Sequence, residues 1–414
     1  MNFYSLKFFA LLATCGVLLA VFASAQVMAA GGALIAVLGM LVAVAIAARL
    51  LRPAHYVLTS LEIAWLLFIA ALFFATILAN LKLSYLDGAM QFRLFFMLVL
   101  WSVWLFVVPT LVRDVVALEG AVRAFDAFGI MVSASVFLPI VAGVGEAQGA
   151  ESALGRVFGP FGDPVPFVVA LFACRALVAG RWPQLAFHLT ALLVTVGLGA
   201  SLTLLVAFAA HFLLPWRARS NVRKPLGRRL LLAVLFAPVV IAVVALFAPR
   251  IVGRVLDPVL MATTLASRFG SFNVAADIIA NHPVAGVGLN GFTAVADNIG
   301  AEAFFVGRFN TNFIVNAANQ TLQTLTDAGI FGFTAFVVFC VLLYKRLSWA
   351  ANHSPVDRPA FRAYQIWLVG ILIGNQTAVW MQPISPVSMC LFFVGGLALA
   401  ASRIAARPAG IVAQ

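Results

Sequence analysis

Long apolar runs follow one another along most of the chain and are separated by short polar segments. Most runs cover about 17–25 residues, which is the length that an α-helix needs to cross a hydrocarbon layer about 30 Å thick. The period-two alternation that marks the strands of a membrane β-barrel is absent. The pattern therefore predicts an all-α, polytopic membrane protein with about twelve transmembrane helices, at residues 8–28, 32–48, 57–78, 93–111, 124–143, 164–180, 183–199, 202–216, 230–249, 325–344, 364–382 and 386–402.

The connections between these spans differ in charge, and this difference predicts the topology. Nineteen of the 26 lysines and arginines fall into alternate connections, including the cluster RARSNVRKPLGRR at residues 217–229. Cytoplasmic connections of membrane proteins collect basic residues, so this side is expected to be cytoplasmic, together with both termini. The opposite side carries seven basic and nine acidic residues, and we expect the working surface there.

Composition adds three restrictions. A chain that is 64% hydrophobic and 10% charged has too little charge to cover a soluble domain of 414 residues. The net charge of +12 lies in short clusters between spans, which does not indicate a nucleic-acid partner. The four cysteines lie within spans and lack the spacing of a disulfide framework or a metal site.

Lys7 and Ala23-Ser24-Ala25 resemble a cleavable signal peptide, but a retained first span fits the topology better.

Residues 1–414 are expected to form a single integral membrane domain, in which 250–324 is a large external loop with short helices between the ninth and tenth spans. Within this loop, 263–283 predicts an amphipathic helix whose face of Phe269, Phe272, Ala276 and Ile279 is apolar. Pro283 ends it. The following glycines, Gly286, Gly288 and Gly291, spell G-x-G-x-x-G, but no strand is expected before them, which favours a tight turn over a dinucleotide site.

Polar side chains crowd the start of the tenth span. Asn316, Asn319 (or Gln320) and Gln323 share one helical face, with Asp327 a turn further on. Amides in lipid would be unsatisfied, so this stripe must face protein or water. Two interpretations are open: hydrogen bonding between helices together with an interfacial cap, or the wall of a polar cavity that holds hydroxyl-rich material.

Three stretches carry a resemblance to a known superfamily: RVFGPFGDPVPF (156–167), SRFGSFNVAADIIANHPVAGVGLNGF (267–292) and NQTLQTLTDAGIFG (319–332). Their order, their spacing and the overall topology resemble those of the O-antigen ligase and polysaccharide polymerase proteins of bacterial envelopes. Two departures are visible. Ala318 stands where the ligases usually have His, and Ser201-Leu202 stands where many members have Ser-Arg. The departures favour a polymerase of exopolysaccharide or O-antigen repeat units, with a divergent or inactive relative as the alternative.

The resemblance implies a glycosyltransferase in the bacterial inner membrane with its active face in the periplasm. Its implied donor is an undecaprenyl-diphosphate-linked oligosaccharide, and its implied surroundings are membrane lipids. The diphosphate is already a good leaving group, so no metal or other cofactor is expected. The resemblance leaves open whether a chain-length regulator or other envelope assembly proteins bind.

The same resemblance suggests site residues. The guanidinium group of arginine can donate two parallel hydrogen bonds to phosphate oxygens. Candidate contacts to the diphosphate are therefore Arg156, Arg268 and Arg308. The alternative role for each is a salt bridge to a carboxylate of the loop. His282 or Asp327 is the candidate base that takes the acceptor proton, and another loop carboxylate could replace them. Asn319 and Gln323 complete the predicted catalytic and glycan-binding set.

Two other functions fit the pattern less well. A ligase would attach finished polymer to lipid A-core. A secondary transporter or flippase would usually show internal repeats and charges near the bilayer centre, and the chain shows neither clearly.

Overall fold

The computed structural model describes residues 58–138, 165–195, 198–213, 258–298, 317, 319–374 and 385–406. The described residues form helices and connecting turns, without strands: α4 Ser60–Lys82, α5 Gly88–Leu111, α6 Val115–Ser135, α9 Val165–Ala179, α10 Trp182–Thr195, α11 Leu198–Leu213, α13 Pro258–Asn281, α14 Gly291–Asn298, α15 Gln320–His353, α16 Arg358–Gly374 and α17 Pro386–Ala405.

Short polar side chains start several of these helices. Thr59 and Glu62 form a capping box at the start of α4. Asp87 accepts from the backbone N–H of Met90 at 3.0 Å, and Asp114 accepts from that of Ala117 at 2.7 Å. A helix start has donors without partners inside the helix, and these side chains satisfy them.

Four helices, α4, α5, α15 and α17, are long and apolar enough to cross a membrane, and α9 and α11 are shorter apolar helices. The chain is therefore a multi-pass membrane protein. A helix covers much of each predicted span that falls on described residues, whereas the spans predicted at 8–28, 32–48 and 230–249 lie outside them.

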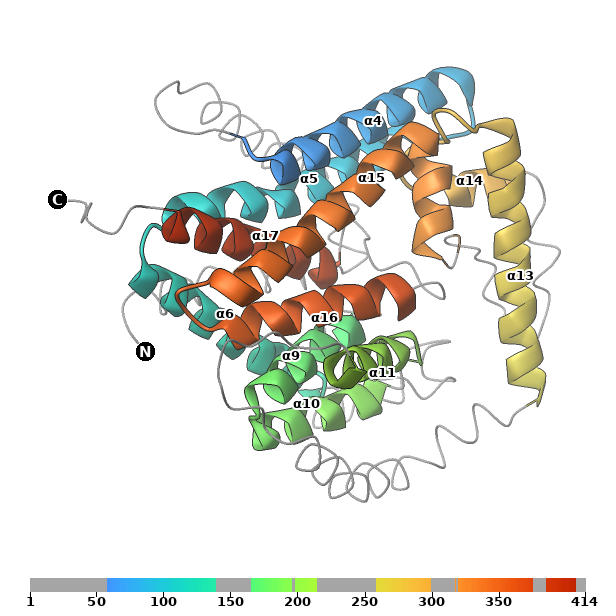
Figure 1. Ribbon diagram of the computed structural model, residues 1–414. Helices are drawn as coiled ribbons and strands as arrows, with labels where there is room; N and C mark the ends of the chain where they lie inside the picture. The colour runs from blue at the N-terminus through green and yellow to red at the C-terminus, as the bar shows by residue number, and fades with distance from the viewer. Residues whose placement is uncertain are drawn as a thin grey trace.

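The bundle is built around α17, which is buried over most of its length (Figure 1). Trp65 of α4 contacts Phe392 of α17, with ring centroids 4.5 Å apart, and Phe339 of α15, with centroids 5.0 Å apart. A Cβ at Gly396 would lie 2.5 Å from the carbonyl oxygen of Trp104, so only glycine permits this approach of α17 to α5. Small residues at such crossings are typical of membrane helices.

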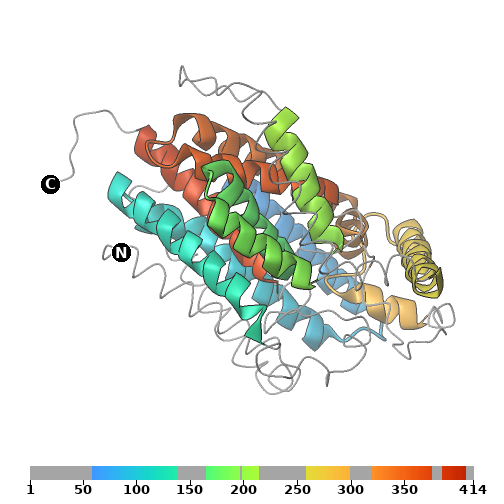
Figure 2. The same cartoon turned by 90° about the horizontal axis from the view of Figure 1, so that it is seen from below.

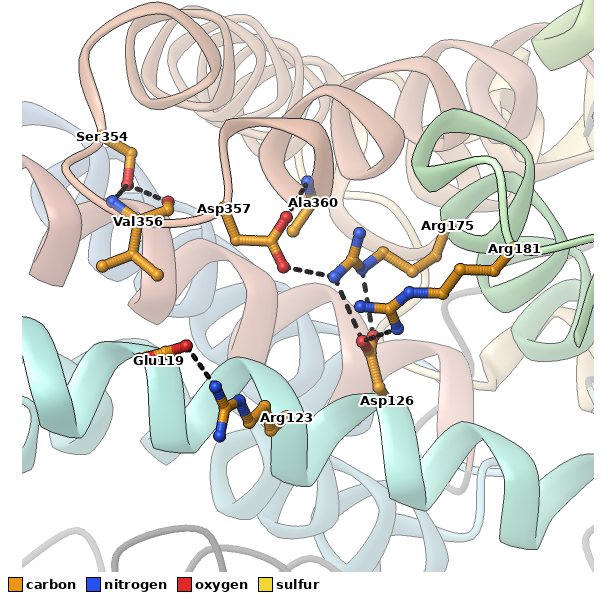
Figure 3. Close-up of polar contacts among 9 residues, drawn as sticks. All are labelled: Glu119, Arg123, Asp126, Arg175, Arg181, Ser354, Val356, Asp357 and Ala360. Atoms are coloured by element: carbon orange, nitrogen blue, oxygen red, sulfur yellow. Dashed lines mark hydrogen bonds and ion pairs between the residues drawn. The ribbon is translucent and has the colours of Figure 1, made fainter. Parts of the chain in front are cut away.

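Polar contacts lie at both ends of the described bundle. At one end, Arg175 pairs with Asp126 and with Asp357, so the α9–α10 and α15–α16 turns meet there (Figure 3). At the other end, the turn after α13 meets α4, α5 and the start of α15.

The end opposite to Arg175 has a second, smaller core, formed mainly by α13, α14 and the turn between them: Val274, Ala275, Ile278, Val287, Phe292, Val295, Ala296 and Ala317. Helix α13 runs across the direction of the bundle helices there in Figure 1 and is seen almost end-on in Figure 2. This small core covers one end of the bundle.

The helix predicted at 263–283 corresponds to α13, which starts earlier, at Pro258, and has 24 residues. The predicted apolar face is not the face that packs on the protein: Phe269 and Ala276 are exposed, while Ser271, Val274, Ala275 and Ile278 are buried. Sequence periodicity found an apolar face but not the one that meets the bundle, since small and branched apolar residues line the other side as well.

Candidate active site

Helix α15 begins with a capped, buried turn and then breaks. Asn319 is the N-cap, and its Oδ1 accepts from the backbone N–H of Leu322 at 3.1 Å. Gly329 leaves the helical region with φ 61° and ψ −167°. Figure 1 shows the resulting short first segment set at an angle to the long remainder of α15. The predicted residues Gln323 and Asp327 lie in this first segment and are buried.

The segment after α13 is a tight turn. The backbone N–H of His282 donates to the carbonyl oxygen of Ile278 at 2.7 Å, and Pro283 ends the helix. Gly286 and Gly288 then have φ values of 70° and 78°, and Asn290 follows with 61°. Glycine adopts such left-handed values without steric cost. The G-x-G-x-x-G pattern is thus a turn between two helices, as the sequence favoured.

This turn supplies the hydrogen bonds that the break in α15 removes. A continuous helix would join the N–H of Ile330 to the carbonyl oxygen of Thr326. Instead, Thr326 O accepts from Val287 N at 2.8 Å, and Ile330 N donates to Pro283 O at 3.0 Å. Asp327 O accepts from Gly288 N at 3.0 Å. We call this set of three bonds the turn–helix joint; it brings the second and third sequence motifs together.

The carboxylate of Asp327 is held beside this joint. Its Oδ1 accepts from Gln323 Nε2 at 2.8 Å, and the backbone N–H of Asn290 also donates to the carboxylate. Gln323 Oε1 in turn accepts from the backbone N–H of Ala317 at 2.8 Å. Only 6% of Asp327 is exposed. Gln323 thus fixes the orientation of a buried acid, in the relationship that their four-residue spacing predicted.

Helices α4 and α5 contribute polar side chains that the sequence analysis missed. Thr76 Oγ1 accepts from the backbone N–H of Leu289 at 3.2 Å, and Gln91 Nε2 donates to Val287 O at 3.2 Å. Asn80 Nδ2 donates to Gln91 Oε1 at 2.6 Å. Their positions within long apolar helices were a usable signal, because an amide there must face protein or water. They anchor the turn to the transmembrane bundle.

The other predicted residues have different positions. His282 is half-buried and directly precedes Pro283, whose carbonyl takes part in the turn–helix joint. Arg268 is on α13, 13 residues before the last helical residue Asn281, a separation of about 20 Å along the axis at 1.5 Å per residue. The structure therefore places Arg268 away from the turn. Arg156 and Arg308 lie outside the described residues.

The amides of α15 are satisfied within the protein. Besides the bonds of Gln323, Gln320 Nε2 donates to Thr324 Oγ1 at 3.2 Å, and Asn319 caps the helix. This agrees with the interpretation of the polar stripe as internal hydrogen bonding and a cap. Within the described ranges, no group of three or more His, Cys, Asp or Glu side chains is arranged to hold a metal ion.

The fold and the joint define a multi-pass membrane protein with a buried acid beside a structured loop at one end of its bundle. Residues 184–337 match the family model described as O-antigen ligase. This segment extends from α10 into α15 and contains two of the three motifs, at 267–292 and 319–332. The match confirms, for this segment, the resemblance to the O-antigen ligase and polysaccharide polymerase superfamily. A search of curated proteins finds no match to the chain.

Proposed function

We propose that the protein is a polysaccharide polymerase that transfers a growing glycan from undecaprenyl diphosphate to a lipid-linked repeat unit at the periplasmic face of the inner membrane. The observation that carries this proposal is the match of residues 184–337 to the O-antigen ligase family. The matched segment includes both sides of the turn–helix joint and the buried carboxylate of Asp327.

The preference for polymerisation comes from residues in which the chain departs from the ligases that it resembles. Ala318 precedes Asn319 where those ligases usually have histidine, and Leu202 follows Ser201 where many members have arginine. A base and a cation of the ligases are therefore absent from the matching positions. The family description itself favours the second candidate, a ligase that attaches glycan to lipid A-core.

The reaction requires removal of a proton from the acceptor hydroxyl and stabilisation of the diphosphate as it leaves. We assign the first task to Asp327 or His282, which lie on the two sides of the joint, with Gln323 orienting the carboxylate through its 2.8 Å bond. We assign the second task to Arg156 and Arg308, whose guanidinium groups suit phosphate oxygens. Arg268, which lies about 20 Å along α13 from the turn, stays a candidate contact to the glycan part of the donor. Asn319 would act through its cap, which sets the start of α15.

Product analysis with the purified, reconstituted protein tests the proposal. The protein receives undecaprenyl-diphosphate-linked repeat units, with and without lipid A-core. A ladder of longer lipid-linked glycans without core is the expected result. Glycan that appears only on core would establish the ligase instead. Intact donor with no product in either mixture, from protein that is folded by its melting curve, would contradict both enzymes.

A further inference from the structure

Over residues 268–281, whose side chains the structure describes, helix α13 presents three distinct faces, and one of them packs against the protein. At about 100° per residue, Ser271, Val274, Ala275 and Ile278 form one side, and all four are buried. We call this side the bundle face. It contributes Val274, Ala275 and Ile278 to the small core beneath the helix. The bundle face accounts for the position of α13 but not for its remaining apolar residues.

A second side, which we call the aromatic face, consists of Phe269, Phe272, Ala276 and Ile279. Phe269 is 62% exposed, and its ring meets that of Phe272 edge-on with centroids 6.5 Å apart. Ala276 is also exposed, and Phe272 and Ile279 are half-buried. Contiguous apolar surface of this kind marks a contact with another apolar phase or partner.

The third side, the polar face, consists of Asn273, Asp277 and Asn281, and all three residues are exposed. Asn281 Nδ2 donates to the backbone oxygen of Asp277 at 3.0 Å and lies 3.2 Å from its Oδ1, so these groups satisfy one another along the helix. The polar face suits water. A helix that has one face for protein, one for water and one for an apolar phase is suited to the boundary between water and the apolar phase.

The position of α13 identifies the apolar phase. The helix lies across the end of the bundle rather than along the membrane helices (Figures 1 and 2), as a helix in the plane of a membrane does. Its C-terminus leads to Val284, which is 56% exposed. Pro283, one residue earlier, bonds to Ile330, and Ile330 and Phe331 are exposed on the apolar helix α15. Exposed apolar surface therefore continues from the membrane span to the turn at the end of α13.

We propose that α13 lies in the membrane–water interface, with the aromatic face of Phe269, Phe272, Ala276 and Ile279 among the acyl chains of phospholipids. The bilayer then contributes to the position of the turn and of the turn–helix joint, because α13 leads directly into both. The proposal needs the membrane character of the chain but not its transfer activity.

Spin labels on the separate faces test this position. Phe269→Cys and Ala276→Cys place a label on the aromatic face, and Asn273→Cys is the matched control on the polar face. The described native cysteines Cys174, Cys340 and Cys390 are buried, and Cys15→Ser is included in every variant. Collision of each label with dissolved oxygen, which partitions into lipid, and with a water-soluble nickel chelate is measured in phosphatidylethanolamine–phosphatidylglycerol liposomes.

The expected result is an oxygen-to-nickel collision ratio several-fold higher at residues 269 and 276 than at 273. A ratio at 269 and 276 equal to that at 273 would place the aromatic face in water and overturn the proposal. Low collision with both reagents at 269 and 276 would mean that another protein surface covers them, which also overturns it. Ala276→Cys removes no aromatic ring, so it keeps the test decisive if Phe269→Cys fails to fold.

Discussion

The backbone N–H of Gly288 donates a hydrogen bond of 3.0 Å to the carbonyl oxygen of Asp327, which joins the turn after α13 to the residue two positions before the break in α15. The two residues are far apart in sequence, yet this bond holds Asp327 against the turn, where the backbone N–H of Asn290 donates to its carboxylate. The joint therefore sets where the candidate base lies, and the predictions below test its parts separately.

Gly329→Ala is expected to disrupt the joint. A Cβ at this position would lie 2.1 Å from Val284 O, and its φ of 61° already disfavours a side chain. Backbone strain of about 1–3 kcal/mol and overpacking of about 1–3 kcal/mol should both lower stability. Gly180→Ala is the matched control, because Gly180 has a φ of 68° but nothing within 4 Å of its added Cβ. Thermal unfolding in detergent should show the larger fall for Gly329→Ala, and equal falls would mean that the contact with Val284 yields easily.

Asp327→Asn is expected to reduce transfer by about 100-fold or more, because an amide keeps the shape of the carboxylate but cannot take a proton. The variant should keep its melting temperature, since asparagine has nearly the same shape and its Oδ1 can still accept from Gln323 Nε2. The rate of product formation checks this. Near-normal transfer by a stable Asp327→Asn protein would assign Asp327 a purely structural role.

His282→Gln tests the other candidate base. If His282 takes the acceptor proton, transfer falls by about 100-fold or more while the turn stays intact, since glutamine preserves the backbone bond to Ile278. His353→Gln is the control at the opposite end of α15, where the His353 ring stacks on Trp349. Full activity in both variants would exclude His282 and leave Asp327 as the candidate.

Arg175→Met should destabilise the bundle without touching the candidate site. The Arg175 side chain is 3% exposed and bonds Asp126 twice at 3.1 Å as well as Asp357 (Figure 3). Removing one partner of a buried charge cluster costs about 3–5 kcal/mol. Thermal unfolding should show this loss.

Arg123→Met is the control for that experiment. Arg123 pairs with Glu119 four residues away, and both side chains are substantially exposed. Surface pairs of this kind contribute about 0–1 kcal/mol. A loss for Arg175→Met no greater than that for Arg123→Met would mean that Arg181, which also bonds Asp126 at 2.8 Å, replaces Arg175.

Local patterns in the sequence predicted features that depend on neighbouring residues. The spacing of Gln323 and Asp327 placed them on one helical face, and the structure joins them by a hydrogen bond. Glu62 is buried at the start of the apolar helix α4, where it forms a capping box with Thr59 and lies 3.6 Å from Arg403. Such contacts follow from helix geometry and from the cost of burying charge.

Features that need distant partners were not predictable in the same way. Gly329 lies in an apolar stretch that reads as continuous helix, and the break is stable only because a turn about 40 residues earlier supplies replacement bonds. The positions of Thr76 and Gln91 in apolar helices indicate that they face protein or water, but the sequence does not show that their partners lie in that same turn. The packed face of α13 was also missed, since hydropathy does not distinguish an apolar side that meets protein from one that is exposed.

All three bonds of the turn–helix joint use main-chain atoms on both partners. Because the joint uses main-chain atoms, it restricts few side chains. Proline is excluded at the positions that donate an N–H, and any side chain is excluded at Gly329, where a Cβ would clash with Val284. Exposed positions beside it, such as Val284 and Ile330, can change without altering these bonds. Chains built on the same backbone could thus exchange the groups around the joint, and with them the sugars that they accept, while the geometry stays fixed.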